Sequence, residues 1–384
     1  MADDPNRLRT PLTILIVGPA ESVHVSRWTR FLVKRGHKVM LYTERDPPEP
    51  LGAAETRRWP LGWLPRTVRI FAAAFALAWW RRRMRVDITN VQSMGANSVV
   101  TIGLPPRGLV LSAWGSDLLQ PSSAVQRALV RHGLRRASLV LTTSCDMASR
   151  VRDLLDGRPT PIRVESWGVD GSLFRPPTEM ERSEARARWG LPDEAVVVLS
   201  PRSVKPLYRT RLIVDAFAQA CATRTDLRLV LLAGFEPANS RARAIGVAYR
   251  RAAWAAARTL GDRAILIDET LAPSEMASLY WAADAVLSVP LTDQRASSVI
   301  EALCAGLLVI GADIPAYREL RDEGHSITLV DDPLVPRLVE ALRSVERPTI
   351  AERTDRGRRT QTNEDQADRF KAIESTLLTV ASRR

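Results

Sequence analysis

The chain has 384 residues, which is enough for two domains of ordinary size. Hydrophobic residues make up 45% of it and charged residues 26%, a balance that excludes an intrinsically disordered protein. The formal net charge of +12 favours anionic partners such as nucleotide phosphates, anionic lipid surfaces or nucleic acid, and charge alone does not choose among these.

The first half of the chain alternates short apolar runs with helical patterns. Residues 12–17 predict a buried strand, a turn follows at Gly18, residues 25–34 predict a helix and residues 38–43 predict the next strand. This βαβ opening predicts a parallel sheet covered by helices. Because Gly18 stands without the other glycines of a dinucleotide fingerprint, a nicotinamide-dependent enzyme is disfavoured. Further strands are expected at 86–91, 108–112 and 138–142.

Residues 46–66 are rich in Pro, Gly and Arg and predict a loop, and residues 67–84 predict a strongly apolar helix. We favour a core helix of the first domain for this segment. The alternative is a helix that lies on a bilayer, because its aromatic residues are accompanied by many arginines. Those residues are Trp63, Phe71, Phe75, Trp79 and Trp80 beside Arg66, Arg69, Arg81, Arg82, Arg83 and Arg85.

Between the two halves, the Pro-rich end of residues 167–177 and the charged run 179–188 predict a domain linker. The second half repeats the α/β alternation, with strands expected at 195–200, 227–233, 264–267, 285–289 and 307–310 and helices at 211–222, 241–260 and 273–283. We therefore expect an α/β protein with domains at 1–176 and 177–362 and a polar C-terminal helix within 363–384. Two such domains predict a cleft, and open α/β sheets bind ligands at the carboxyl ends of their strands.

The three cysteines are Cys145, Cys221 and Cys304. Their odd number and the lack of a CxxC pair argue against a disulfide framework and against a structural zinc site. Each lies among apolar or small residues, so we expect buried, unreactive thiols. The acidic first ten residues do not resemble a secretory signal, and the longest apolar run, 70–80, is too short to span a bilayer. A cytoplasmic location is the expectation.

The most informative segment is 291–311, which predicts a loop with Asp293, a short helix with Glu301, a stop at Gly306 and a buried strand. Ser297 is the expected N-cap of the helix. Two acids eight residues apart thus flank a helix N-terminus at a strand end. The amide groups of such a terminus favour an anion, and the acids suit sugar hydroxyls. The segment predicts a nucleotide-sugar site.

This arrangement resembles the retaining GT-B glycosyltransferases of family 4, whose signature is Glu-x7-Glu followed by a small residue and a glycine before a Val-rich strand. Here Asp293 takes the first position and Glu301 the second. The resemblance covers most of the chain. It implies two Rossmann-like domains facing each other across a cleft, the first for the acceptor and the second for the nucleotide sugar. It also implies that the C-terminal helix crosses back to the first domain.

Four further segments are similar to the family pattern. Gly18 lies where the family has a glycine pair that approaches the donor phosphates, and residues 167–176 resemble its interdomain linker. Asp117 belongs to the segment Trp-Gly-Ser-Asp, which lies where family members often have a dipeptide that faces the donor sugar. Asp117 is either a contact to a sugar hydroxyl or a helix N-cap. Residues 200–206 (SPRSVKP) carry Arg202 and Lys205 at the place where family members have two cations that neutralise the donor diphosphate. Arg209 or Arg211 could replace Lys205.

In the mechanism that the resemblance implies, Arg202 and Lys205 hold the diphosphate, whose developing charge must be stabilised. Glu301 bonds the ribose hydroxyls, and Asp293 orients the transferred sugar. A donor phosphate oxygen takes the acceptor's proton, so we name no protein nucleophile, expect no cofactor beyond the nucleotide-sugar co-substrate, and expect no metal. The amide groups that assist with the phosphates are those of Ser297, Ser298 and Val299.

The main hypothesis is thus a metal-independent, retaining, hexosyltransferase-like enzyme. One alternative is a GT-B epimerase of the nucleotide sugar, although such enzymes usually carry more acids and histidines and this chain has four histidines. Another is a basic nucleic-acid-binding protein, which would need clustered basic and aromatic residues on one face, whereas the arginines are spread over both halves. We therefore expect no nucleic-acid partner. The base, the sugar, the acceptor and the oligomeric state stay open; a glycan, a lipid-linked saccharide and a small natural product are all compatible acceptors.

Overall fold

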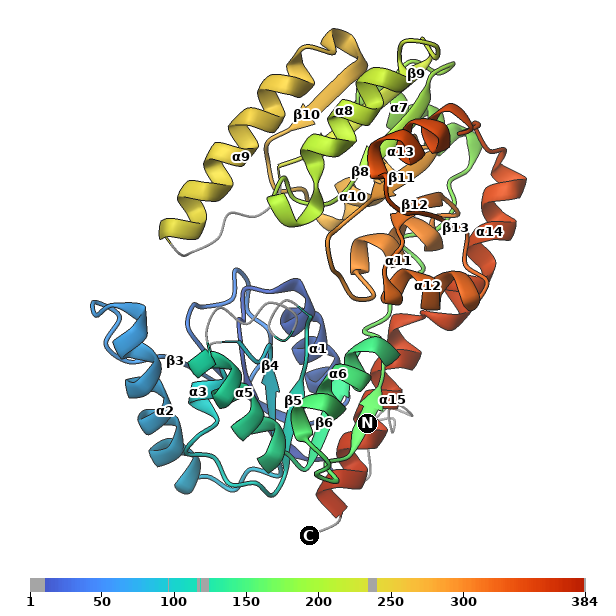
Figure 1. Cartoon of the computed structure of the whole chain (residues 1–384). Coiled ribbons are helices and arrows are strands. Elements are labelled where there is room, and N and C mark those ends of the chain that lie inside the picture. Colours follow the sequence, from blue (N-terminus) through green and yellow to red (C-terminus); the bar gives the residue numbers. More distant parts are fainter. Residues whose placement is uncertain (1–10, 96, 116–117, 119–123, 234–239, 383–384) are drawn as a thin grey trace. The chain divides into compact units, whose positions relative to one another are not determined.

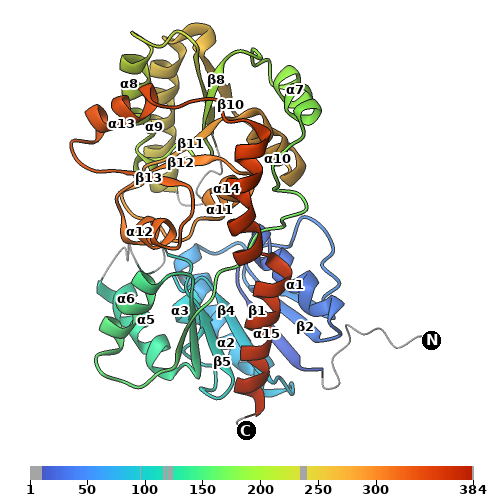
Figure 2. The same ribbon diagram turned by 90° about the vertical axis from the view of Figure 1, so that its right-hand side faces the viewer.

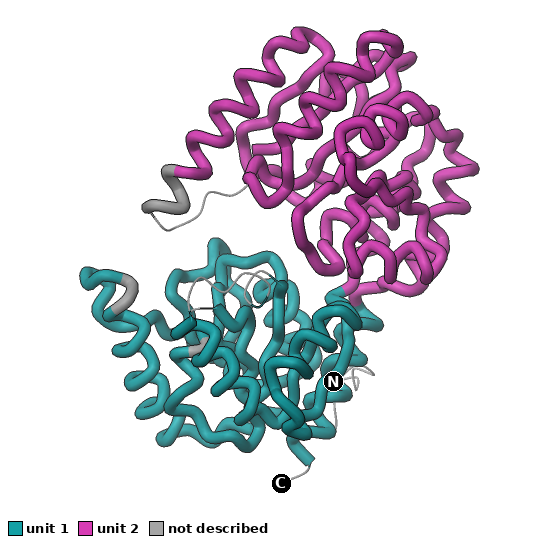
Figure 3. The backbone as a smooth tube through the Cα atoms, in the orientation of Figure 1, with its two compact units in different colours: residues 1–167, 367–384 teal, residues 168–366 magenta. Residues whose placement is uncertain are grey.

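A computed structural model describes residues 11–95, 97–115, 118, 124–233 and 240–382. The chain divides into two compact units (Figure 3). Unit 1 comprises residues 1–167 and 367–384, and unit 2 comprises residues 168–366. Each unit contains one parallel β-sheet with helices on its faces, as the alternation of apolar runs and helical patterns predicts (Figure 1).

The sheet of unit 1 has seven strands in the order β3-β2-β1-β4-β5-β6-β7, and every neighbouring pair is parallel. Its inner strands are runs of Val, Ile and Leu because helices cover both faces. The strands are β1 (Thr13–Val17), β2 (Lys38–Thr43), β3 (Glu55–Arg58), β4 (Ile88–Gln92), β5 (Leu109–Ser112), β6 (Leu139–Thr142) and β7 (Ile162–Val164).

The edge strand β3 lies inside 46–66, so the prediction of a loop throughout that segment was wrong. Its sequence, ETRR, is charged and mostly exposed because an edge strand pairs on one side only, and it therefore lacks the apolar pattern of an inner strand. The helices of unit 1 are α1 (Val23–Lys34), α2 (Arg66–Arg82), α3 (Asn97–Val100), α5 (Ala124–Arg136), α6 (Cys145–Leu155) and α15 (Gln366–Ser382).

The last helix, α15, runs along unit 1 beside α1 (Figure 2). The helix expected within 363–384 is α15, and only its expected polar character was wrong. A separate helix ends at Asn363, and α15 buries a stripe of apolar residues against the core of unit 1: Phe370, Ile373, Leu377 and Ala381. Its Glu374 accepts from Arg35 at 3.1 Å and lies 2.9 Å from His37 Nε2, so a buried ionic cluster fixes the helix in place.

The sheet of unit 2 has six parallel strands in the order β10-β9-β8-β11-β12-β13. They are β8 (Val196–Ser200), β9 (Leu227–Leu232), β10 (Ala264–Ile267), β11 (Ala285–Ser288), β12 (Leu308–Ala312) and β13 (Ile327–Val330). The helices are α7 (Glu179–Arg188), α8 (Thr210–Ala220), α9 (Ser240–Arg258), α10 (Pro273–Ala282), α11 (Ser297–Cys304), α12 (Pro315–Asp322), α13 (Leu334–Arg343) and α14 (Ile350–Asn363).

The charged run 179–188 is helix α7, so the expectation that it forms a linker was wrong. Thr178 and Glu181 form a capping box at its start. Arg182 and Arg186 look like solvated residues in the sequence, but both are buried and share the carboxylate of Asp284 inside unit 2. The chain passes from unit 1 to unit 2 between Trp167 and Gly168.

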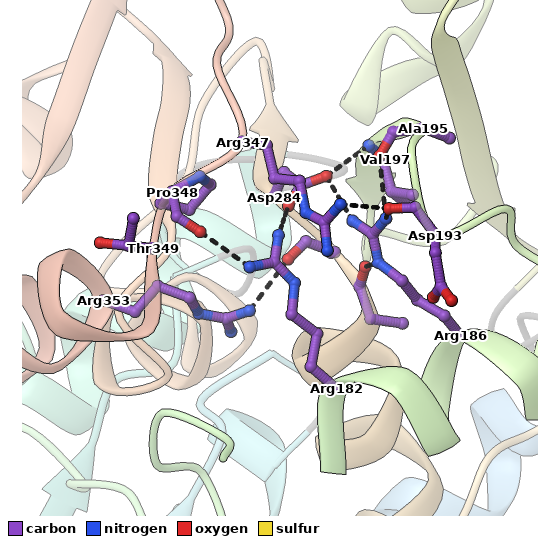
Figure 4. A network of polar contacts seen from close by, with 12 residues as sticks. Arg182, Arg186, Asp193, Ala195, Val197, Asp284, Arg347, Pro348, Thr349 and Arg353 are labelled. Carbon is purple, nitrogen blue, oxygen red and sulfur yellow. Dashed lines mark hydrogen bonds and ion pairs between the residues drawn. The ribbon is translucent and has the colours of Figure 1, made fainter. Parts of the chain in front are cut away.

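Figure 4 shows this buried network, in which Arg182, Arg186 and Arg353 lie close to Asp284. One carboxylate oxygen of Asp284 accepts from Arg186 Nη2 and from the Val197 amide, both at 2.7 Å. Arg182 donates to the other oxygen. Arg353 donates to the Ala305 carbonyl at 2.9 and 3.1 Å, which satisfies an acceptor at the end of α11. Burial, followed by the charge of Arg182, lowers the pKa of Arg353 to about 9.

Two of the three thiols are buried, as expected, and one is not. Cys221 and Cys304 lie in the core of unit 2, and burial raises the pKa of both. Cys145 is exposed, which corrects the expectation, because it is the first residue of α6 and follows the buried N-cap Ser144. Small neighbours in sequence therefore did not indicate burial.

Candidate functional site

The candidate site lies where two adjacent strands of unit 2 end. β8 and β11 pair in parallel, and both lead into loops at the carboxyl edge of the sheet. Arg202 follows β8 by two residues, and Asp293 stands on the loop that connects β11 to α11. The topology thus brings together two segments that are far apart in the sequence, at the edge where open α/β sheets bind ligands.

The guanidinium of Arg202 is the centre of this group. Its Nη2 lies 2.7 Å from Asp293 Oδ2, and its Nη1 donates to the Ser298 hydroxyl at 3.0 Å. The guanidinium carbon lies 4.3 Å from the centroid of the Tyr208 ring, a cation–π distance. The Arg202 and Asp293 side chains are 14% and 15% exposed, so the pair is shielded from solvent yet reachable from it.

Asp293 is held at both carboxylate oxygens. Oδ1 accepts from the Gln294 amide at 2.9 Å, and Oδ2 accepts from Tyr317 at 3.3 Å in addition to Arg202. Tyr317 in turn lies 2.7 Å from the Ser288 hydroxyl. Burial raises the pKa of Asp293 although the Arg202 charge opposes the rise. Three partners, the Gln294 amide, Tyr317 and Arg202, therefore fix the direction of this carboxylate.

Glu301, on the second turn of α11, shares a partner with Ser298. The Tyr280 hydroxyl donates to the Ser298 carbonyl at 2.9 Å and lies 3.3 Å from Glu301 Oε2. Burial, and then the Glu301 charge, raise the pKa of Tyr280 well above its usual value, so this hydroxyl stays protonated. Sequence reasoning missed Tyr280 and Tyr317 because each is a buried residue of its helix with no local sign of a polar role.

The N-terminus of α11 differs from the expectation in one detail. The N-cap is Ala296 and makes no side-chain cap bond. Ser297 is already helical, so its hydroxyl cannot cap the helix. The Val299 amide donates to the Ala296 carbonyl at 2.9 Å, which uses one of the three amides expected to face phosphate. Within the described part of the chain, the amides of Ser297 and Ser298 meet no acceptor.

Lys205 lies in the electrostatic field of Arg202. Burial, and then the Arg202 charge, lower the pKa of Lys205. The alternative cation Arg211 pairs with Asp215 at 2.9 Å along α8, where side chains four residues apart face each other. Arg209 is the left-handed residue before that helix, with φ of 51°. Arg211 is therefore already engaged on its own helix, and Lys205 and Arg209 stay as candidates for the second cation beside Arg202.

The remaining predicted residues belong to unit 1 or lie outside the description. Gly18 follows β1, and a Cβ added there would lie 2.8 Å from the Gln92 Cβ, so packing against Gln92 already requires a glycine. His24 follows Gly18 at the start of the first helix, where the sequence allows either a hydrogen bond to an acceptor or sugar or no functional role. Its ring meets Trp114 edge-on at 5.6 Å, and burial, followed by the Arg27 charge, lowers the pKa of His24 to about 4. Asp117 lies outside the described residues.

Among the described residues, no group of three or more His, Cys, Asp or Glu side chains is arranged to hold a metal ion. None of the helices that the structure describes has both the length and the apolar composition needed to cross a membrane.

Comparison with known families accounts for both halves of the chain. Residues 22–173 match the family model described as Glycosyltransferase Family 4, and residues 181–362 match the model described as Glycosyl transferases group 1. The chain belongs to the group 1 glycosyltransferases. The second match contains Arg202, Asp293 and Glu301, so the candidate site lies within the family's own domain.

Curated relatives of this group 1 glycosyltransferase include two D-inositol 3-phosphate glycosyltransferases. That of Acidothermus cellulolyticus is 28% identical over 199 residues, which are 51% of this chain and 42% of the relative. That of Saccharomonospora viridis is 30% identical over 226 residues, which are 58% of this chain and 50% of the relative. The matched part of the chain thus spans half or less of these two relatives.

Solved structures show the same fold. Sucrose-phosphate synthase from Thermosynechococcus elongatus has a TM-score of 0.74 at 18% identity, covering 97% of this chain and 98% of that one. Anabaena HepE in complex with UDP and glucose has a TM-score of 0.76 at 16% identity, covering 95% and 99%. These likenesses confirm the predicted GT-B fold with two Rossmann-like domains.

Proposed function

We propose that this group 1 glycosyltransferase moves a sugar from a nucleoside-diphosphate sugar to an acceptor, with retention of the anomeric configuration and without a metal or other cofactor. The observation that carries the proposal is the contact of Arg202 with both Asp293 and Ser298 at the start of α11. This place brings together the Arg202 cation, the fixed Asp293 carboxylate and two amides, those of Ser297 and Ser298, that meet no acceptor among the described residues. That combination suits a diphosphate next to a sugar.

Each group has a distinct role. Arg202 and Lys205 bind the diphosphate and stabilise the charge that develops on it as the sugar leaves. Asp293 accepts hydrogen bonds from hydroxyls of the transferred sugar, and its three partners keep it in the accepting direction. Glu301 accepts from the ribose hydroxyls. The acceptor's proton passes to a donor phosphate oxygen on the face from which the diphosphate leaves, and this path gives retention without a protein nucleophile.

Support for a nucleotide ligand comes from relatives of the fold. HepE has been crystallised with UDP, with UDP and glucose, and with UDP-glucose. UDP is therefore the first nucleotide to test. We place the activity in the cytoplasm, and a glycan, a lipid-linked saccharide and a small natural product are the acceptor classes to compare.

The test is the melting temperature of the purified protein with UDP, GDP, ADP or dTDP in the presence of EDTA. A ligand that binds only the folded state stabilises it by about 2.7 kcal/mol at a hundredfold excess over Kd. We expect one nucleotide to raise the melting temperature and the rise to vanish in Arg202→Ala and Glu301→Ala. Arg211→Ala is the matched control, because it removes a cation of unit 2 that already pairs with Asp215.

Two results would overturn the proposal: no shift with any of the four nucleotides, or a shift that survives both site variants. Once the base is known, the nucleotide sugar is incubated with candidate acceptors and the product is examined by NMR. Retention predicts the donor's anomeric configuration in the product. An epimerised donor without transfer would favour the epimerase alternative.

A further inference from the structure

Helix α2 of unit 1 is apolar on two opposite sides, although only one side has a partner. Ala73, Leu77 and Trp80 are buried in the core of unit 1. On the opposite side, Phe71 is 62% exposed and Phe75 is 77% exposed. A helix that is apolar all round is normally buried all round, so the exposed side of α2 calls for a second partner.

The exposed apolar residues form one continuous face. Val68, Phe71, Phe75 and Trp79 follow at intervals of three and four residues, which places them on the same side of the helix. In the turn before α2, Trp63 is the most exposed large hydrophobic residue of the described chain at 80%, and Leu61 is also exposed. Figure 1 shows α2 along the outer edge of unit 1, next to α3. We call these six side chains the α2 face.

The charge around the α2 face has one sign. Residues 57–86 contain eight arginines and no lysine, aspartate or glutamate. Some are neutralised, since Arg57 pairs with Glu55 and Arg58 with Asp46. Arg82, Arg83 and Arg85, at the end of the helix, are exposed and pair with no carboxylate among the described residues. The guanidinium carbon of Arg83 lies 3.4 Å from the centroid of the Trp79 ring.

A cavity beside the end of α2 extends the same charge. Arg81 and Arg82 line it together with Arg136 of α5 and the turn at Gly103 to Pro105. Arg81 and Arg136 direct part of their guanidinium groups to backbone carbonyls, which holds them in place. Three cations around one open cavity favour an anionic group such as a lipid phosphate.

We propose that the α2 face docks unit 1 on an anionic bilayer surface. Aromatic and aliphatic side chains enter the interface, and the arginines at the helix end bind lipid phosphates, as in interfacial amphipathic helices. A second copy of the chain is a poorer occupant. A two-fold contact through this face would bring arginine-rich surfaces of both copies together, and no acid in residues 57–86 would neutralise them.

The proposal is independent of the proposed function, because no residue of the α2 face belongs to the donor site. It is tested by flotation of the full chain with vesicles of phosphatidylcholine alone, and with vesicles of two parts phosphatidylcholine to one part phosphatidylglycerol. We expect binding to the anionic vesicles only, with an affinity that falls as salt is added.

Three double variants separate the contributions of apolar side chains and of arginines to vesicle binding. Phe71→Ser with Phe75→Ser should weaken the binding about tenfold or more. Arg82→Glu with Arg85→Glu should abolish the preference for anionic lipid. Met180→Ser with Ile245→Ser removes exposed apolar side chains of unit 2 and should bind like the parent protein. All variants should keep the parent's melting temperature, because every substituted side chain is exposed.

Quenching by brominated lipid gives a second measurement. Tryptophan fluorescence should be quenched in anionic vesicles, and Trp63→Phe with Trp79→Phe should remove most of the quenching. Failure of the parent protein to float with anionic vesicles would overturn the proposal. An equal loss of binding in the unit 2 control would also overturn it. A third contrary result would be a concentration-dependent dimer that binds no vesicles and that the Phe71 and Phe75 substitutions convert to monomer.

Discussion

The carboxylate of Asp293 lies 2.7 Å from the guanidinium of Arg202, and each of them holds the other in a defined orientation. Asp293 is the first acid of the family signature, and Arg202 is the cation assigned to the diphosphate. The salt bridge partly neutralises the guanidinium and engages the carboxylate. In the proposed function, a donor phosphate must therefore share Arg202 with Asp293.

Replacing Asp293 by Asn should separate binding from transfer. The substitution keeps the shape and removes the negative charge, so Arg202 becomes more available to a diphosphate. We expect UDP to bind equally well or more tightly. Sugar transfer should fall by about a hundredfold, because the hydroxyls of the transferred sugar lose the carboxylate that accepts their hydrogen bonds. Calorimetric titration with UDP and steady-state kinetics measure the two effects. A parallel loss of both would contradict separate roles for the two residues.

Replacing Arg202 by Lys should show that geometry matters as well as charge. A lysine ammonium is a point charge and cannot reach Asp293 and Ser298 as the planar guanidinium does. We expect the affinity for UDP to fall about tenfold. Arg318→Lys, in an exposed pair with Asp313, is the control and should leave the affinity unchanged. Full retention of affinity in Arg202→Lys would indicate a purely electrostatic role.

Removing the carboxylate of Asp284 should strongly destabilise unit 2. Asp284→Ala leaves Arg182 and Arg186 buried without their counter-charge, and breaking a buried pair in this way costs about 3–5 kcal/mol. Urea denaturation measures the free energy of unfolding. Asp313→Ala, which removes the exposed partner of Arg318, should unfold close to the parent midpoint. Similar midpoints for both variants would argue against the network in Figure 4 as a source of stability.

Two glycines with similar backbone angles should respond very differently to alanine. Gly306 has φ of 75° and a Cβ there would lie 2.0 Å from the Arg353 carbonyl oxygen, whereas Gly261 has φ of 62° and open space around it. Gly261→Ala should lower the free energy of unfolding by about 1 kcal/mol, because alanine is strained in the left-handed conformation. Gly306→Ala should cost clearly more, because α14 must also move away from the end of α11. Equal costs would show that α14 yields freely.

The stability of unit 1 should fall in mild acid through His24. Burial lowers the pKa of His24 to about 4 from 6.5. Between these values the unfolded chain binds a proton that the folded chain does not, so stability is lost as pH falls through this window. The loss is up to about 3 kcal/mol. His24→Gln should flatten this part of the profile, measured by urea denaturation from pH 7 to pH 4. An unchanged slope would exclude His24 as its source.

The sequence indicates the strands of both sheets well, because a strand buried on both faces is a short apolar run. The five strands expected in each half lie within two residues of their observed ends. β3, β7 and β13 were not predicted, and all three lie at sheet edges, where a strand is only partly buried. The helix α7 was misread because Arg182 and Arg186 are charged yet buried. The charge of an arginine says nothing about a counter-charge about a hundred residues away.

The site was predictable in outline and not in its contacts. Asp293 and Glu301 share one local segment, so their spacing marks a helix N-terminus at a strand end. Arg202 was assigned through the family resemblance, from its place after the first strand of the second half. Tyr280 and Tyr317 could not be assigned, since their hydroxyl groups reach the site only through the packing of α10 and α12. The salt bridge of Arg202 with Asp293 has the same tertiary origin.

The inclusion of residues 367–384 in unit 1 has a consequence for the order of events on the ribosome. Unit 2 is continuous in sequence, so all of it has been synthesised before the part of α15 that belongs to unit 1. Unit 1 begins first but lacks Phe370, Ile373 and Leu377 until synthesis of that helix. Its core stays open to water while the second unit closes, because Trp28 lacks Phe370, one of its three ring neighbours. A nascent chain would thus need protection at its beginning rather than at its end, and a chaperone that recognises exposed aromatic surface would bind there.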